Sequence, residues 1–304
     1  MQIKKVIDIA KWNVVTDYNK VRNAGVDGAV VKVINSANNV DGLFYTHCNG
    51  LRKAGIPIIG GYNYLYSNTV AKAEAVAPKF IQLCQSQGIK TAWMDIEDAC
   101  MKNLGSNLAK IINVYYKYAK QYDIYLGIYT SGPFYNSYIK PFKSMIPNLP
   151  IWFARYPSGT KEYSVRQDIP STKNLPTGLD LDGWQYTSKC KIPGINGYVD
   201  LSVWWENTPF VNLEPAVLIQ SNPFTEPTSN VTNGAMGNDA NWVLWYLWVF
   251  GKYVDSGGIP DSTKVNGMIS DTDYQYIKDV QKVLGLTADG IVCKVTRATW
   301  KKIR

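Results

Sequence analysis

The sequence predicts an α/β protein: an incomplete TIM-like (β/α) barrel that lacks its later helices, plus a small C-terminal all-α module. Three features predict this fold. Short apolar runs alternate with amphipathic stretches through the first 210 residues, the last stretches there are too polar or too short for helices, and a Pro-containing segment precedes a Trp-rich tail. Strands that alternate with helices favour a parallel sheet, and eight such strands favour a barrel.

The expected strands are short apolar segments rich in β-branched and aromatic residues. The eight predicted strands are Lys5–Ala10, Gly28–Ile34, Pro57–Tyr64, Thr91–Glu97, Tyr125–Thr130, Pro150–Tyr156, Asp182–Thr187 and Tyr198–Val203. Helices are expected between the earlier strands, where apolar residues recur at helical spacing. The predicted helices are Thr16–Ala24, Gly42–Ala54, Val70–Gln87 and Ser106–Gln121, with a shorter one after Pro133.

The last part of the barrel departs from this regular pattern. The stretch between Tyr156 and Asp182 is polar and rich in Pro and Gly, which makes it a poor helix. Only ten residues separate Thr187 from Tyr198, whereas a parallel crossover needs a dozen or more. We therefore expect loops or hairpins to connect the last strands.

A linker and a second domain are expected after the barrel. Residues 211–232 contain three prolines among small polar residues, a composition typical of linkers. We assign residues 1–210 to the barrel, 211–234 to the linker and 235–304 to a helical module. In the module, an apolar helix is expected over 239–253, followed by amphipathic helices over 274–284 and 296–303 around an Ala-Asp-Gly turn.

The charge of the chain indicates an anionic partner. The net charge is +8, and residues 1–210 carry all of it, with 23 basic and 15 acidic residues against nine of each in residues 211–304. Nucleic acid, a membrane surface and an acidic wall polymer all fit such a charge. No basic run or phosphate-binding Gly loop favours nucleic acid. Membrane insertion is not expected, because the longest apolar stretch, Val243–Phe250, has eight residues.

Histidine and cysteine usage disfavours several chemistries. His47 is the only histidine, too few for usual zinc hydrolase sites, and it precedes all five cysteines, unlike in papain-like enzymes. We expect no metal or cofactor, His47 on a helix surface, and free thiols. The N-terminus has no apolar run after its lysines, so no signal peptide is expected and synthesis in the cytoplasm is predicted.

Four carboxylates stand in otherwise apolar strands, where the carboxyl ends of barrel strands build active sites. Asp95 and Glu97 are two residues apart and face one side of a strand, whereas Asp98 is expected to be a loop or cap residue. Asp8 and Asp200 lie on the first and last strands, which a closed barrel makes neighbours. Several acids without histidine or metal suit glycoside hydrolysis, in which a protonated carboxyl group gives its proton to the leaving oxygen.

Aromatic residues surround these acids and suit a sugar polymer, whose rings present C–H faces that stack on aromatic rings. About half of them are expected to fill the core. The candidate substrate-binding residues are Tyr62, Tyr64, Tyr129, Trp152, Tyr156, Trp184 and Tyr186, and Tyr62, Tyr129, Tyr156 and Tyr186 are favoured because they lie nearest the strand ends.

Seven segments, in order, resemble the glycoside hydrolase family 25 lysozymes over residues 3–208: DIA, IIGGYNYLY, AWMDIED, LGIYT, PIWFARY, DGWQYT and GINGYVDLSVW. This resemblance implies an incomplete β/α barrel that hydrolyses the β-1,4 bond between N-acetylmuramic acid and N-acetylglucosamine in peptidoglycan. By position, it implies that Glu97 is the general acid/base, that Asp95 assists it, and that Asp8 and Asp200 complete the site. It leaves open whether the nucleophile is a protein group or the acetamido oxygen of the substrate.

Two positions depart from the family pattern. Ala10 stands where the family usually has Ser, and Asn63 replaces the His of the third strand, so different substrate contacts are expected near Asn63. The tail segment VQKVLGLTADGIVCKVTRATWKKI resembles a three-helix peptidoglycan-binding domain, with Cys293 where Gly is usual. The Trp-rich helix, with Trp242, Trp245, Trp248 and Phe250, is then either its core or a ligand surface.

The expected protein is a modular peptidoglycan hydrolase, a phage endolysin or a bacterial autolysin, that acts on the bacterial cell wall. Lack of a signal peptide favours the endolysin, which another factor releases at host lysis. The alternative is a non-catalytic carbohydrate-binding protein on the same fold. The intact set of four acids favours the enzyme.

Overall fold

The computed structural model describes residues 3–157, 159–179, 181–205, 222–249 and 267–301. Contacts divide the chain into a first unit of Met1–Cys84 and Gly88–Ala216 and a second that contains Val217–Arg304. The first unit holds a sheet with its helices, and the second holds helices α6, α7 and α8. Among the described residues, no helix combines the length and apolar character needed to cross a lipid bilayer.

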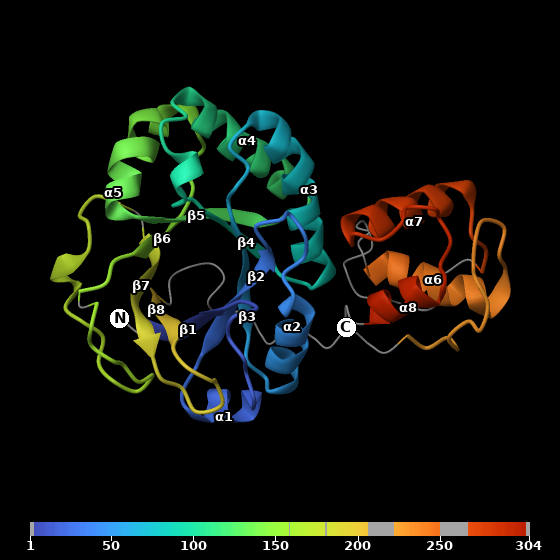
Figure 1. The fold of residues 1–304 in the computed structure, drawn as a ribbon, viewed down its shortest axis with the longest axis horizontal. Coiled ribbons are helices and arrows are strands. Elements are labelled where there is room, and N and C mark those ends of the chain that lie inside the picture. Colours follow the sequence, from blue (N-terminus) through green and yellow to red (C-terminus); the bar gives the residue numbers. More distant parts are fainter. Residues whose placement is uncertain (1–2, 158, 180, 206–221, 250–266, 302–304) are drawn as a thin grey trace. The chain divides into compact units, whose positions relative to one another are not determined.

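The first unit is a closed barrel of eight strands in chain order (Figure 1). All eight predicted strands are confirmed, with ends shifted by a few residues. The strands are β1 (Ile3–Ile9), β2 (Gly28–Ile34), β3 (Ile58–Tyr64), β4 (Thr91–Asp95), β5 (Tyr125–Ser131), β6 (Ile151–Ala154), β7 (Leu181–Cys190) and β8 (Val199–Trp205). Strands β1 to β7 pair in parallel, whereas β8 runs antiparallel to both β7 and β1.

The predicted helices are also confirmed, and they lie outside the strands (Figure 1). They are α1 (Tyr18–Asn23), α2 (Phe44–Lys53), α3 (Val70–Ser86) and α4 (Ser106–Gln121). After β5, short turns of helix replace one long helix: α5 (Gly132–Phe134), η2 (Tyr135–Ile139) and η3 (Lys140–Met145). Two further 3₁₀ turns are η1 (Ala99–Met101) and η4 (Thr172–Asn174).

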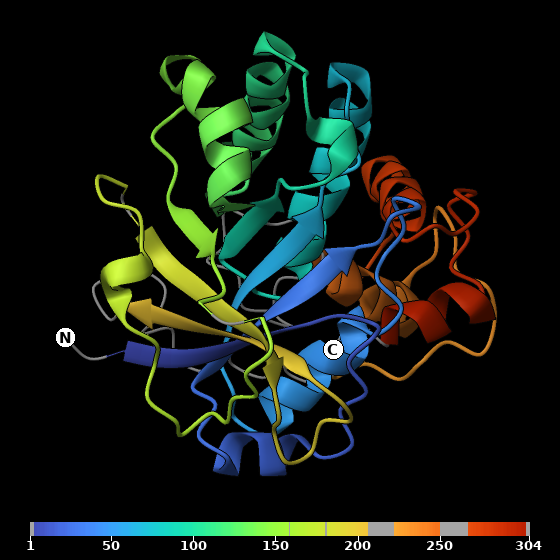
Figure 2. The same cartoon turned by 60° about the vertical axis from the view of Figure 1, so that its left-hand side comes forward.

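Among the residues that the structure describes, only the short turn η4 lies between β6 and β7 and no helix lies between β7 and β8, as predicted. Strands β7 and β8 form an antiparallel pair. Beside β7, β8 and β1, a loop-rich segment between β6 and β7 takes the place of a helix (Figure 2). Lys5 of β1 donates from Nζ to the carbonyl of Gln167 at 2.9 Å, and Tyr163 packs edge-on against Tyr186 at 5.4 Å between ring centres. Polar and aromatic contacts therefore hold this covering segment.

Three tryptophans fill the barrel interior. Trp93, Trp152 and Trp204 are fully buried, with ring centres 5.1–6.0 Å apart. Glycines on neighbouring strands make room for them, since a Cβ on Gly127 would lie 2.2 Å from the Trp93 ring, and one on Gly183 would lie 2.8 Å from the Trp204 ring. This packed layer forms a solid floor beneath the carboxyl ends of the parallel strands.

His47 is buried, so its expected position on a helix surface is wrong. On α2 its Nδ1 lies 2.8 Å from the hydroxyl of Tyr18, and its Nε2 lies 3.1 Å from the carbonyl oxygen of Ala10. Burial lowers the pKa of His47. The imidazole links α2 to the chain just after β1, a structural use of histidine that the pattern of α2 does not reveal.

The second unit is built around α6 (Gly237–Val249), α7 (Asp271–Val283) and α8 (Lys294–Lys301). From Trp242 to Leu247 every side chain of α6 is buried, so within that stretch the helix is core rather than a ligand surface. The expected α6 extension over 250–253 lies outside the described residues. Gly290 has φ +76°, and a Cβ there would lie 2.3 Å from the Tyr274 ring, so the predicted Ala-Asp-Gly turn needs its glycine.

The end of the expected linker differs from the prediction. Residues 211–221 lie outside the described residues, but residues 222–234 pack onto the helices of the second unit. Asn222 donates from Nδ2 to the carbonyl of Trp242 at 2.9 Å, Val231 is buried, and Glu226 accepts from Nζ of Lys301 at 2.7 Å. A Pro-containing polar segment is thus ordered by bonds to helix backbone and side chains.

Candidate active site

A cavity of about 180 Å³ opens above the tryptophan floor, at the carboxyl ends of the parallel strands. The structure brings together there all four acids singled out from the sequence. The lining residues are Asp8, Tyr62, Tyr64, Asp95, Glu97, Tyr129, Trp152, Tyr156, Gln185 and Asp200.

Asp8 and Asp200 face each other across the barrel seam. They are register partners in the antiparallel pair β1–β8. The expectation that every acid lies at a strand's carboxyl end is wrong for Asp200, which is the second residue of β8. Because β8 runs antiparallel to its neighbours, its amino end lies at the same mouth as the carboxyl ends of the others.

Asp95 and Glu97 reach the cavity from β4. Asp95 is the last residue of the strand and is buried, whereas Glu97 lies two residues beyond the strand end and is half-buried. Asp98 does not line the cavity. It begins η1 and accepts a hydrogen bond from the Cys100 backbone N–H at 2.8 Å, which confirms its predicted capping role.

Burial raises the pKa values of all four acids, and neighbouring carboxylates raise those of Asp8, Asp95 and Glu97 further. Burial is the main cause in each case. Beyond burial, the charge of Asp200 raises the pKa of Glu97, and the charge of Glu97 raises that of Asp95. The pKa of Asp200 is raised to about 6, while that of Asp8 is raised well above its usual value. A hydrogen bond joins this pair, and it raises the pKa of Asp8 and lowers that of Asp200.

Gln185 is a cavity residue that the sequence analysis missed. It donates from Nε2 to Oδ2 of Asp8 at 2.9 Å, and its Oε1 accepts from the hydroxyls of Tyr129 at 2.7 Å and Tyr156 at 2.5 Å. The amide therefore fixes the position of the Asp8 carboxyl group and of two aromatic rings. Its signal in the sequence is an amide between two aromatic residues of an apolar strand.

Lys32 is a second residue that the sequence analysis missed. It lies on β2, and its Nζ is 5.5 Å and 5.3 Å from the ring centres of Tyr62 and Tyr64. Its positive charge lowers the pKa values of Asp95 and Glu97 and so partly offsets the effect of burial. A lysine inside the apolar run VVKVI is the signal that could have identified it.

Five of the seven candidate aromatic residues line the cavity, and two do not. Trp184 and Tyr186 flank Gln185 on β7, and strand alternation turns them to the opposite face. Trp184 donates from Nε1 to the carbonyl of Arg155 at 2.8 Å. Asn63 also points away from the cavity, since it is buried and donates from Nδ2 to the hydroxyl of Tyr115 at 3.1 Å. The expected change in substrate contacts near Asn63 thus has no support in this geometry.

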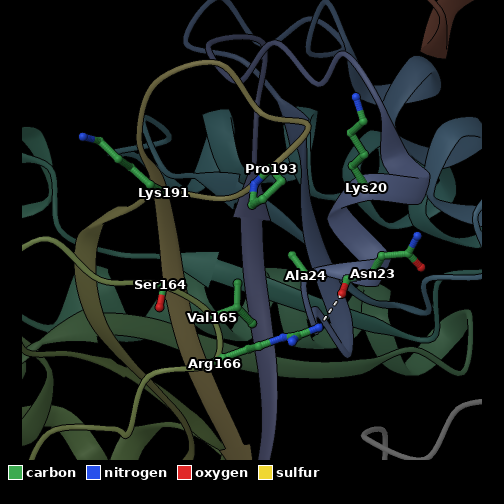
Figure 3. A pocket seen from close by; sticks show the side chains of 8 residues that line it. All are labelled: Lys20, Asn23, Ala24, Ser164, Val165, Arg166, Lys191 and Pro193. Carbon is green, nitrogen blue, oxygen red and sulfur yellow. Dashed lines mark hydrogen bonds between the residues drawn. The ribbon is translucent and has the colours of Figure 1, made fainter.

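A second cavity, of about 390 Å³, lies elsewhere on the first unit (Figure 3). Basic side chains and no carboxylate are among its lining residues, which are Lys20, Asn23, Ala24, Ser164, Val165, Arg166, Lys191 and Pro193. Arg166 donates from a guanidinium N–H to the carbonyl of Asn23 at 3.0 Å (Figure 3). Without an acid–base pair, this cavity does not suit glycoside hydrolysis.

The site has the composition of a carboxylate-only centre. Within the described ranges, no group of three or more His, Cys, Asp or Glu side chains is placed to hold a metal ion. A protonated carboxyl group beside ionised ones can deliver a proton to a leaving oxygen and stabilise positive charge that develops on a sugar ring.

Comparison with known proteins agrees with this geometry. The sequence model of the family described as "Glycosyl hydrolases family 25" matches residues 7–195. The autolytic lysozyme of Clostridium acetobutylicum is 26% identical over 289 residues, which cover 93% of this chain and 74% of that protein.

Solved structures share the barrel. The modular autolysin LytC of Streptococcus pneumoniae aligns with a TM-score of 0.52 and 26% identity, over 67% of this chain and 47% of its own, so this chain spans about half of it. The catalytic domain of endolysin ply40, from bacteriophage P40 of Listeria monocytogenes, aligns with a TM-score of 0.54 and 24% identity. That match covers 69% of this chain and 96% of the ply40 domain.

Proposed function

The chain belongs to the glycosyl hydrolases of family 25, and from this premise we propose that it is a lysozyme that acts on bacterial peptidoglycan. The proposed reaction is hydrolysis of the β-1,4 bond between N-acetylmuramic acid and N-acetylglucosamine. The observation that carries the proposal is the convergence of Asp8, Asp95, Glu97 and Asp200 in one aromatic-lined cavity. The named autolytic lysozyme relative supports the choice of peptidoglycan as substrate.

Glu97 is the proposed general acid. It is the acid that extends beyond its strand at the mouth, half-buried, where a glycosidic oxygen can approach. Burial and the neighbouring charge of Asp200 raise its pKa, which keeps the carboxyl group protonated closer to neutral pH. In the reaction, Glu97 gives its proton to the oxygen of the departing sugar as the bond from that oxygen to the anomeric carbon breaks. The same group then accepts a proton from the incoming water.

The other acids are proposed to stabilise the charge that develops on the sugar ring. Asp200, hydrogen-bonded to Asp8, is ionised above a pH of about 6 and lies at the mouth. Asp95 is buried below Glu97, where it assists by its charge or by orienting the acetamido group of the substrate. Gln185 holds Asp8 in place, and Tyr129 and Tyr156 bond to the same amide, which gives the acids a fixed geometry.

The second unit is proposed to bind the wall. Its support is the sequence resemblance of the tail to a peptidoglycan-binding domain. Because residues Trp242 to Leu247 are core, ligand contact must come from other surfaces of the unit. The protein is proposed to work at the cell wall, as a phage endolysin or as an autolysin.

The decisive experiment is mass spectrometry of purified Gram-positive peptidoglycan digested by the protein. New reducing ends on muramic acid are expected. Reducing ends on glucosamine, or released peptides, would refute a muramidase. Wall binding without any soluble product would favour the alternative, a non-catalytic carbohydrate-binding protein.

The role of Glu97 is tested with a Glu97→Gln variant, which keeps the size of the side chain and removes the transferable proton. Loss of a general acid costs about 10²- to 10⁴-fold in rate. Glu74→Gln is the matched control, because Glu74 is a glutamate on α3 that pairs with Lys117 at 3.4 Å and does not line the cavity. Wild-type clearing of a wall suspension by Glu97→Gln would remove Glu97 from this role.

A further inference from the structure

Two apolar side chains and a tyrosine, whose hydroxyl donates to Glu162, are unusually exposed beside the cavity mouth. Trp12 is 77% exposed, Val14 50% and Tyr198 41%. We call Trp12, Val14 and Tyr198 the outer patch. A large aromatic side chain left in water loses the stabilisation that burial would give, so a group of such residues commonly marks a binding surface.

The outer patch is built on the same strand pair as two of the site acids. Trp12 and Val14 follow β1, which carries Asp8, and Tyr198 immediately precedes β8, which carries Asp200. Trp12 is four residues from Asp8, so the Cα atoms of the two residues are at most about 14 Å apart. Tyr198 is two residues from Asp200, so their Cα atoms are at most about 7 Å apart. The patch therefore borders the cavity.

Backbone hydrogen bonds hold the two segments of the patch together. The N–H of Asn196 donates to the carbonyl of Val14 at 3.0 Å, and the N–H of Thr16 donates to the carbonyl of Gly194 at 2.8 Å. The carbonyl of Ala10 is tied to the buried His47 at 3.1 Å, and the Ala10 N–H donates to the Asn13 side chain at 2.9 Å. The exposed side chains thus stand on a braced surface rather than on a free loop.

The cavity is too small to hold a polymeric substrate, so such a substrate must continue outside it. Its volume of about 180 Å³ is below the range of roughly 300–1,000 Å³ that encloses a drug-sized ligand. A glycan strand therefore extends over the rim on both sides of the cleaved bond. At the rim, the Nζ of Lys11 lies 4.4 Å from the Trp12 ring centre, so a cation accompanies the aromatic platform. Such a surface suits a sugar ring whose substituents carry carboxylates.

We propose that the outer patch is a subsite that holds the peptidoglycan glycan strand where it leaves the cavity, with one sugar ring stacked on Trp12. This inference rests on the proposed function, because it takes peptidoglycan as the substrate of the acid-lined cavity. It adds a specific consequence: the protein distinguishes long strands from short fragments through a residue that does not line that cavity.

The test compares hydrolysis of polymeric peptidoglycan with that of a soluble tetrasaccharide fragment of the same glycan. Trp12→Ala is expected to raise KM for the polymer roughly tenfold and to leave kcat unchanged, as for truncation of a central aromatic contact. The tetrasaccharide should lose much less, because it has few sugar rings outside the cavity with which to contact the outer patch. Trp12→Phe should restore part of the loss.

The matched control is Tyr125→Ala. Tyr125 is also an exposed aromatic residue, at 40%, but it begins β5 and so lies at the opposite end of the barrel. It should act as wild type on both substrates. Equal loss on both substrates for Trp12→Ala, or none on the polymer, overturns the proposal.

A binding measurement keeps the two proposals separable. Retention on insoluble walls is compared for Glu97→Gln and for the Trp12→Ala/Glu97→Gln double variant, with melting temperatures to check folding. Weaker retention of the double variant supports the outer patch even if the wild type cleaves neither substrate, a result that would sink the proposed function alone. Equal retention overturns the outer patch.

Discussion

Four carboxyl groups share one small cavity, where burial raises the pKa of each and neighbouring charges raise those of Asp8, Asp95 and Glu97 further. The neighbouring charge of Asp200 is the largest cause, after burial, of the raised pKa of Glu97. Asp200 itself has a pKa of about 6, so above that pH it is ionised and acts on Glu97. The proton on the proposed acid therefore depends on a residue on another strand.

Asp200→Asn is expected to move the basic limb of the pH profile of kcat/KM to lower pH. Removing the negative charge lowers the pKa of Glu97, so the acid loses its proton earlier as pH rises. The measurement is initial rate of wall clearing across pH for both proteins. The position of the limb, rather than the height of the profile, decides the outcome. An unchanged limb would mean that Glu97 does not set it.

Asp95→Asn is expected to stabilise the barrel while reducing activity. Asp95 is buried, its Oδ1 has no hydrogen-bond partner among the described residues, and its pKa is raised well above the usual value. A carboxyl group with a raised folded-state pKa contributes stability at low pH and loses it as pH rises through that pKa. The variant should thus gain on the order of 1 kcal/mol at pH 7.

The gain from Asp95→Asn should shrink as pH falls toward the ordinary carboxyl pKa, where the wild-type group is protonated in both states. Thermal unfolding at pH 7 and at pH 4 checks this. A gain of the same size at both pH values would indicate a packing effect instead of relief of buried charge.

Residue identity alone could not separate cavity residues from their strand neighbours. The sequence located the four acids, because charged residues within apolar strands stand out. It did not reveal which face of β7 points inward, so Trp184 and Tyr186 were expected in the site and Gln185 was not. The register of strand pairing decides which side chains of β7 point inward. The pairing of β7 with β8 has register irregularities, and the alternation of residue types in the sequence does not reveal them.

At the scale of elements, the barrel depends on tryptophan rings that pack against glycines of neighbouring strands. Gly127 on β5 faces the ring of Trp93 on β4, and Gly183 on β7 faces Trp204 on β8. This matching fixes the floor beneath the site. Strand positions could be predicted from apolar runs, and the antiparallel end of the barrel from the short connection before β8. The matching of glycine to tryptophan could not, because it needs the three-dimensional register.

Gly127→Ala is expected to destabilise the barrel by about 1–3 kcal/mol, the usual cost of overpacking. Its Cβ would lie 2.2 Å from the Trp93 ring, and the ring is enclosed by Trp152 and Trp204. Gly159→Ala is the control, because a Cβ at that position would meet nothing within 4 Å. Chemical denaturation of both variants is the measurement, and equal midpoints would show that the floor can rearrange.

At the scale of the whole molecule, the net charge changes along the sequence near the place where the barrel ends. The first 210 residues carry the entire net charge of +8, and residues 211–304 are neutral. The two-part organisation was visible in composition, but the extent of the linker was not. Pro and small polar residues of 222–234 are ordered by specific bonds, such as that from Asn222 to Trp242, and no composition rule identifies such bonds.

The charge division predicts that attraction of the protein to anionic walls is carried by the barrel and weakens with salt. Lys53 and Lys102 are exposed residues of the barrel, whereas Lys282 and Lys294 are exposed residues of the second unit. On a Glu97→Gln background, which prevents wall digestion, Lys53→Gln/Lys102→Gln should weaken wall binding at low salt more than Lys282→Gln/Lys294→Gln does. Both double variants lower the total charge equally, so a difference in wall binding shows which part of the chain attracts the wall.

The difference in wall binding should disappear near 1 M salt, where screening reduces the distance over which charges interact to about 3 Å. Equal effects at low salt would mean that the wall responds to the charge of the whole chain, and the neutral second unit would then share in the electrostatic attraction.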